Sequence, residues 1–165
     1  MGKAPQRAAF SAAVKEKAVQ GATWLLPLDV DEYLVVHEGE GRLSDLIAAA
    51  PDASVISIPW RLFGSDDIVS FEDRPVSQQF RAAAPDYAPR PLQAWGFKTL
   101  YLNDGAFGKI GVHAPRKLDP ERARDLVWLD GSRRPLPQRE WSNAWRMTPS
   151  TWGYGLAQIN HYAVR

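Results

Sequence analysis

A short apolar segment that ends in acidic residues constrains this chain more than any other feature. Residues 24–28 read Trp-Leu-Leu-Pro-Leu, and Asp29, Asp31 and Glu32 come directly after them. Such a run is too short for a typical helix and is typical of a buried strand. Pro27 disfavours a fully paired central strand, because proline has no N–H to donate to the ladder. The pattern predicts a buried strand whose end opens on an acidic site.

Strand and helix patterns alternate after this segment. Residues 33–36 form a short apolar run, and residues 54–59 alternate and are rich in β-branched side chains. Both patterns predict strands. Between them Leu43, Leu46 and Ile47 recur at helical spacing. A strand, a helix and a strand in this order favour an α/β fold.

The remaining segments have local patterns that predict a helix, a long loop and further strands. An amphipathic helix is predicted between Gln6 and Val19, and residues 66–91 are predicted to form a long loop because they contain many prolines and few periodic apolar residues. Further strands are predicted at residues 97–102, 109–113, 127–129 and 156–164.

Length and composition predict one folded domain over residues 1–165. The chain has 20 basic and 19 acidic residues and a formal net charge of +1. It therefore lacks the strong positive electrostatic field that is typical of a nucleic-acid-binding protein. The absence of cysteine excludes disulfides and thiolate metal sites. The N-terminus lacks a signal-peptide pattern, and no apolar run is long enough for an integral membrane segment. We therefore expect a cytoplasmic protein.

Asp29 and Asp31 are candidate ligands for a divalent cation. They flank a single residue at a predicted strand end. Two carboxylates at this spacing can converge on Mn²⁺ or Mg²⁺ and on a diphosphate that the cation bridges. A pair of acids that caps a turn has the same spacing, and for an isolated D-x-D it is the more common reading.

Four sequence blocks together resemble family 2-like glycosyltransferases with the GT-A fold. WLLPLDVDEYL at residues 24–34 resembles the D-x-D-E-[FY] strand end of that family. The other blocks are PWRLFGS at 59–65, GVHAP at 111–115 with Lys98-Thr99 before it, and INHYA at 159–163. Their order and spacing are similar to the family across nearly the whole chain. The resemblance implies a GT-A-like mixed sheet with flanking helices.

The resemblance also implies a nucleotide-sugar donor and a saccharide or other hydroxyl acceptor. Asp29 would contact the ribose or diphosphate side of the donor and lie at the metal, and Asp31 would bind the metal directly. Glu32 would orient the loop or reach the sugar. A late histidine beside the metal is usual in this family, and we rank His161 before His113 for this role.

Five further residues are candidates from their positions in these blocks. Trp60 could supply a face for sugar stacking, and Gly64 could let the backbone approach the donor. Arg61 and Lys98 could pair with phosphate, although either could form an ordinary surface ion pair. An inverting transferase needs a carboxylate base, and Asp67 is the candidate for it by location.

The sequence departs from the family at both ends, since it also stops directly after the block at residues 159–163, where family members continue. The nucleotide-binding strand-helix repeat that normally precedes the D-x-D is missing, so we expect an N-terminally truncated glycosyltransferase domain with weak or no transfer. Uncovered strand edges would favour self-association. Two alternatives stay open. One is a haloacid-dehalogenase-like phosphatase with Asp29 as nucleophile and Asp31 as acid/base. The other is a non-catalytic remnant that binds a carbohydrate or a partner.

Overall fold

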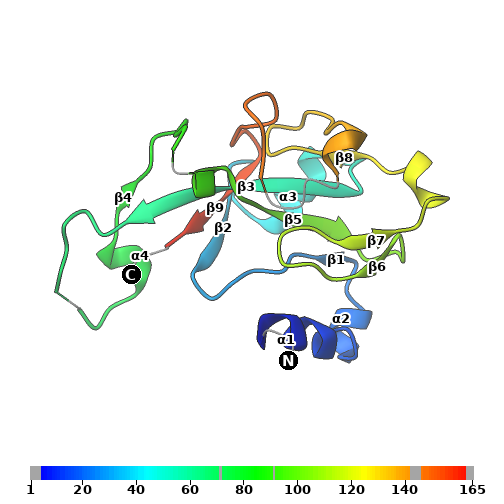
Figure 1. Cartoon of the computed structure of the whole chain (residues 1–165), viewed down its shortest axis with the longest axis horizontal. Coiled ribbons are helices and arrows are strands. Elements are labelled where there is room, and N and C mark those ends of the chain that lie inside the picture. Colours follow the sequence, from blue (N-terminus) through cyan, green and yellow to red (C-terminus); the bar gives the residue numbers. More distant parts are fainter. Residues whose placement is uncertain (1–4, 71, 91, 142–145, 163–165) are drawn as a thin grey trace.

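A mixed β-sheet forms the centre of the molecule. The computed structural model describes residues 5–70, 72–90, 92–141 and 146–162. β3 and β9 pair in parallel, and the other neighbours in the main path pair antiparallel. The predicted α/β class with a mixed sheet is confirmed. The order across this sheet (Figure 1) is β1 (Trp24–Leu25), β5 (Phe97–Leu102), β3 (Val55–Gly64), β9 (Ala157–His161) and β2 (Glu32–Val36).

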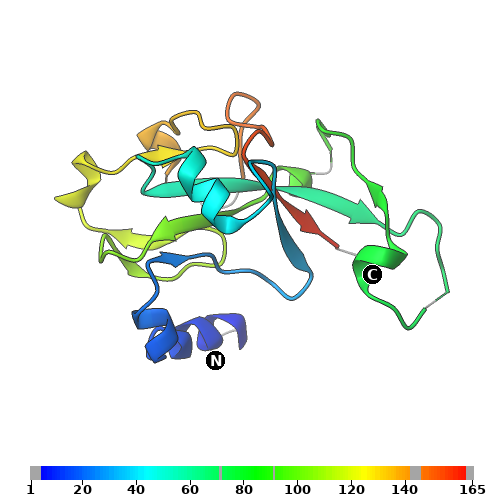
Figure 2. The same ribbon diagram turned by 180° about the vertical axis from the view of Figure 1, so that it is seen from behind.

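Helices and short strands surround this sheet. Figure 2 shows α3 crossing the sheet, while α1 and α2 lie together beyond β1. None of the helices in the described ranges is long and apolar enough to cross a membrane. The helices are α1 (Pro5–Ala13), α2 (Lys17–Gln20), α3 (Leu43–Ala49) and α4 (Val76–Gln79), with 3-10 turns at Leu92–Trp95, Arg122–Arg124 and Gln138–Glu140. The remaining strands are β4 (Ala82–Ala83), β6 (Phe107–Lys109), β7 (Arg116–Leu118) and β8 (Trp128–Leu129).

The long strand β3 organises the core. Its residues 55–60 are buried, and Ile56 and Ile58 pack against Leu46 of α3. Pro59 is tolerated in this central strand because its nitrogen falls between two ladders. The β8 ladder ends at Ile56, and the β9 ladder begins at Trp60.

Several predicted elements are confirmed and others differ. The strands at residues 33–36, 54–59 and 97–102 and the helix around Leu46 are present. The strand expected at residues 24–28 stops at Leu25, two residues before the proline.

The strand predicted at residues 109–113 is wrong. Lys109 ends β6, which pairs with β7. A Cβ on Gly111 would lie 1.8 Å from the carbonyl oxygen of Ala114, so the chain turns tightly there.

Candidate functional site

One face of the sheet is apolar over most of its length and carries polar residues near one end. Side chains that lie directly opposite each other on paired strands share a face. Lys98 lies opposite Ile58, and His161 lies opposite both Leu62 and Glu32. This is the face that packs against α3. Three strands therefore bring a lysine, a histidine and a glutamate to the same region, although these residues are far apart in the sequence.

Lys98 is a buried cation that joins the acidic segment to the sheet. Its Nζ lies 2.9 Å from Asp29 Oδ2 and 3.2 Å from Glu32 Oε2, and it donates to the Val112 carbonyl oxygen at 3.0 Å. The side chains of Lys98 and Glu32 are fully buried, whereas that of Asp29 is 34% exposed. A buried charge requires such partners. The contacts with Asp29 and Glu32 fix where the loop after β1 lies, and the contact with Val112 joins Lys98 to the segment after β6.

The loop itself is closed by reciprocal hydrogen bonds. The Asp29 N–H donates to Glu32 Oε2 at 2.9 Å, and the Glu32 N–H donates to the Asp29 carbonyl oxygen at 3.2 Å. Asp29 Oδ1 accepts a hydrogen bond from the side chain of Gln6 in α1. Both carboxylate oxygens of Asp29 are thus engaged by protein groups, and the loop is held from two sides.

Glu32 keeps one carboxylate oxygen buried without a protein partner. Oε1 accepts no hydrogen bond from the described part of the chain. Burial raises the pKa of Glu32 above its usual value, and the backbone hydrogen bond from Asp29 and the charge of Lys98 oppose that rise.

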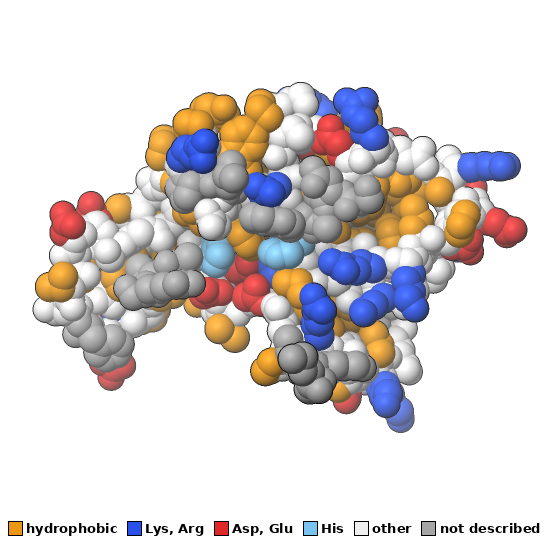
Figure 3. All heavy atoms as spheres, viewed as in Figure 1, with side chains coloured by type: hydrophobic (Ala, Val, Ile, Leu, Met, Phe, Trp, Pro, Cys, Tyr) orange, Lys and Arg blue, Asp and Glu red, His pale blue; other side chains and the backbone are white. Residues whose placement is uncertain are grey.

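Asp31 and His161 form a second polar pair beside this cluster. Asp31 Oδ2 lies 3.5 Å from His161 Nε2, and the Tyr162 N–H donates to the Asp31 carbonyl oxygen at 3.0 Å. The side chain of Asp31 is 43% exposed and that of His161 is 16% exposed. Figure 3 shows the two histidines of this region at the surface, with acidic side chains directly beside them. The pair can therefore be reached by a ligand.

The spacing of Asp31 Oδ2 and His161 Nε2 suits two ligands of a divalent cation whose other ligands come from water and a bound molecule. Neighbouring ligand atoms of an octahedral Mg²⁺ lie about 3 Å apart, close to the separation of this pair. Within the described ranges no group of three or more histidine or acidic side chains could hold a metal ion. Two protein ligands are compatible with Mg²⁺ or Mn²⁺ when water and substrate phosphates supply the others.

Trp60 lies under both candidate histidines. Its ring centroid is 4.4 Å from that of His161 and 5.4 Å from that of His113. Only 6% of Trp60 is exposed, so the indole supports the two imidazoles from below and offers little surface to a ligand. Gly96 lies against the indole, since a Cβ at that position would be 2.1 Å from Trp60 Cε3.

His113 lies near the positive charge of Lys98. Its Nδ1 is 3.3 Å from the Phe97 carbonyl oxygen. Burial lowers the pKa of His113, and the charges of Lys98 and Arg116 lower it further, while the Phe97 contact and Asp29 act in the opposite direction. The imidazole therefore prefers its neutral form more strongly than an exposed histidine does.

This shift predicts a pH dependence of stability. An unfolded histidine takes up its proton near pH 6.5, and folded His113 does so only at lower pH. In that window the unfolded chain binds more protons, so the free energy of unfolding must fall as the pH falls. We expect the protein to lose more stability than His113→Gln between about pH 7.5 and pH 5.5. Urea unfolding of both at several pH values measures this, and parallel curves would contradict it.

Two predicted site residues lie elsewhere on β3. Arg61 follows Trp60 and therefore points to the opposite face, where Nη1 lies 2.7 Å from Asp86 Oδ1. Gly64 ends β3 opposite Ala82, and a Cβ there would meet no atom within 4 Å. Neither residue joins the cluster around Lys98.

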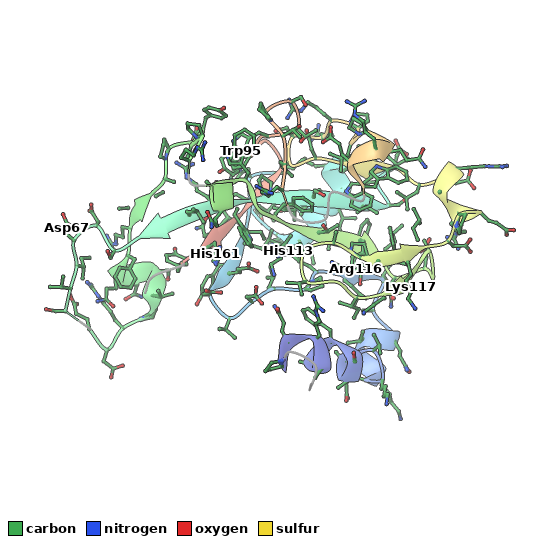
Figure 4. All side chains as sticks on the ribbon, viewed as in Figure 1. Asp67, Trp95, His113, Arg116, Lys117 and His161 are labelled. Atoms are coloured by element: carbon green, nitrogen blue, oxygen red, sulfur yellow. The ribbon has the colours of Figure 1, made fainter. Side chains whose placement is uncertain are left out.

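Asp67 lies in the turn after β3. Asp66 and Asp67 both have positive φ, and the Ile68 N–H donates to the Ser65 carbonyl oxygen at 2.9 Å. Aspartate is a common residue in turns of this kind. Figure 4 shows Asp67 at one end of the molecule, away from His113 and His161 near its centre. The structure does not bring this carboxylate to the other candidates.

Two contributors to the site were not predicted from the sequence. Gln6 binds Asp29 from the N-terminal helix, and the carbonyl oxygen of Val112 accepts a hydrogen bond from Lys98. The helix pattern predicts α1 but contains no signal for where it docks. Every residue has a main-chain carbonyl, so the residue type does not indicate which carbonyl will accept a hydrogen bond.

Comparison of the sequence with protein-family models and with curated proteins gave no match.

Proposed function

We propose that this chain carries the metal- and diphosphate-binding site of a nucleotide-sugar-dependent glycosyltransferase. The observation that carries the proposal is the approach of Asp31 to His161, at 3.5 Å, beside an Asp29 carboxylate that Lys98 holds. These residues come from three of the blocks that resemble the family. Their convergence on one end of one sheet face supports a common site.

The chain's own residues would divide the work of binding. Asp31 and His161 would hold Mn²⁺ or Mg²⁺, and a bound divalent cation would neutralise charge on the departing nucleoside diphosphate. Lys98 keeps Asp29 in place to contact the ribose or diphosphate side of the donor. The contact with the Trp60 indole would restrict rotation of the His161 imidazole. A preorganised site of this kind needs little rearrangement when the donor binds.

The acceptor would be a saccharide or another hydroxyl compound. We assign no catalytic base, because Asp67 lies outside this cluster. Positioning of the acceptor and stabilisation of the leaving group would be the main contributions to rate.

Calorimetry with uridine and guanosine diphosphates, with and without manganese, tests the proposal. We expect Mn²⁺ to tighten binding of at least one nucleotide by about tenfold or more, and Asp31→Asn and His161→Gln each to remove that gain. Asp52→Asn changes an exposed carboxylate after α3 and serves as the matched control. Glycosyl transfer from a panel of nucleotide-sugars then tests turnover.

Three outcomes would contradict the proposal. Nucleotide binding that ignores manganese in the parent protein would remove the metal role. Hydrolysis of a phosphomonoester that disappears in Asp29→Asn would favour the phosphatase. Saccharide binding without any nucleotide affinity would favour the non-catalytic remnant.

A further inference from the structure

A basic pocket lies between α1 and the segment after β6. It has a volume of about 270 Å³, and we call it the α1 pocket. Arg7, Lys109 and Arg116 supply its charged lining, and Phe10, Val14 and Ile110 supply apolar walls. One helix and two separate strand regions therefore contribute to a single cavity.

The positive charges of the α1 pocket have no acidic partner among the residues that the structure describes. None of the described residues that line the cavity is acidic. Arg7, Lys109 and Arg116 form no ion pair with any residue in the described ranges, whereas many other arginines do. Cations that gather around a cavity create a positive potential that attracts an anion. Arginine and lysine together are the usual partners of phosphate.

The α1 pocket lies next to the cluster around Lys98. Val112 lines the pocket, and its carbonyl oxygen accepts the hydrogen bond from Lys98 at 3.0 Å. Gln6 precedes Arg7 on α1 and binds Asp29. Figure 3 shows basic side chains gathered beside the two histidines, and Figure 4 places Arg116 next to His113. A ligand could reach from the pocket to the acidic segment.

We propose that the α1 pocket binds the phosphate groups of a nucleotide, with the base or ribose against its apolar walls. Arg7, Lys109 and Arg116 would hold phosphate oxygens, and Phe10 would contact the ring. That this nucleotide is the nucleoside diphosphate of a sugar donor rests on the proposed function. The pocket's affinity for phosphate does not, since it needs neither the metal pair nor transfer.

Binding measured without divalent metal separates the two proposals. With chelator present, we expect inorganic pyrophosphate to bind and uridine or guanosine diphosphate to bind more tightly, because only the nucleotides reach the apolar walls. Arg116→Gln and Lys109→Gln should each weaken both ligands by roughly fivefold. Phe10→Ala should weaken the nucleotides and leave pyrophosphate unchanged. Asp52→Asn, which changes an exposed carboxylate outside both sites, should leave all metal-free binding unchanged.

Lys117→Gln is the matched control. Lys117 follows Arg116 on β7 and carries the same charge, but it does not line the α1 pocket. Absence of metal-free binding in the parent protein would overturn the inference, as would an equal loss in Lys117→Gln. Equal affinity for pyrophosphate and nucleotides would overturn the role of the apolar walls. Circular dichroism would reveal any disturbance of α1 by Phe10→Ala. Arg116→Gln does not change α1, so it tests the pocket in either case.

Discussion

Replacement of Lys98 with methionine is expected to destabilise the protein by about 3 kcal/mol or more. Methionine fills a similar volume but removes the only cation that contacts both Asp29 and Glu32 among the described residues. The Glu32 side chain is fully buried and would lose its counter-charge. Loss of one partner from a buried ion pair costs more than the pair contributes, because the remaining charge stays desolvated.

Urea unfolding of three variants measures this effect. Lys98→Met/Glu32→Gln should recover part of the loss, since the double variant no longer buries an unpaired carboxylate. Lys15→Met removes an exposed lysine between α1 and α2 and should change stability by less than about 0.5 kcal/mol. Equal small losses in Lys98→Met and Lys15→Met would show that the buried contacts contribute little.

The sequence predicted the elements whose signal is local. Residues 33–36 and 97–102 have strand patterns, Leu46 marks the buried face of a helix, and all three elements are present. The strand order is not a local property. Nothing in residues 55–62 indicates that β9, from the end of the chain, pairs in parallel with β3. The register that carries Lys98 to Glu32 depends on that arrangement.

The same distinction applies to the candidate site. Asp31 and His161 could be paired through family resemblance, and the structure brings them together. Lys98 was a candidate either to pair with phosphate or to form a surface ion pair, yet its neighbours Ile58 and Leu100 place it in the interior. Trp60 and Arg61 are adjacent in a strand, so alternation alone indicates that they cannot share a face. The strand predicted at residues 54–59 ends just before this pair, so the predicted alternation did not extend to it.

The α1 pocket had no sequence signal at all. Arg7 and Arg116 are far apart in the chain, and Lys117 is the one basic residue adjacent to either of them. They meet because α1 docks against the loop that follows β6. Such docking depends on the surface that the folded sheet presents, which no short pattern describes.

Gly96→Ala is expected to disturb the site through Trp60. The added methyl would lie 2.1 Å from Cε3 and 2.3 Å from Cζ3 of the indole, well inside van der Waals contact. The main chain at Gly96 cannot easily retreat, because its carbonyl oxygen accepts the Trp60 N–H at 2.8 Å. The indole must therefore shift, at a cost of about 1–3 kcal/mol for overpacking a core. A shifted indole no longer supports His161.

The effect should appear both in stability and at the metal pair. We expect Gly96→Ala to lower the free energy of unfolding by about 2 kcal/mol and to reduce manganese-dependent nucleotide affinity by roughly tenfold. Gly64→Ala is the matched control on β3, because its Cβ would meet no atom within 4 Å. Trp60→Phe has a smaller ring, so it should cost less in the Gly96→Ala background than in the parent protein. Similar results for Gly96→Ala and Gly64→Ala would show that the indole adapts without moving His161. Lost stability with unchanged nucleotide affinity would make Trp60 a core residue with no role in positioning the histidine.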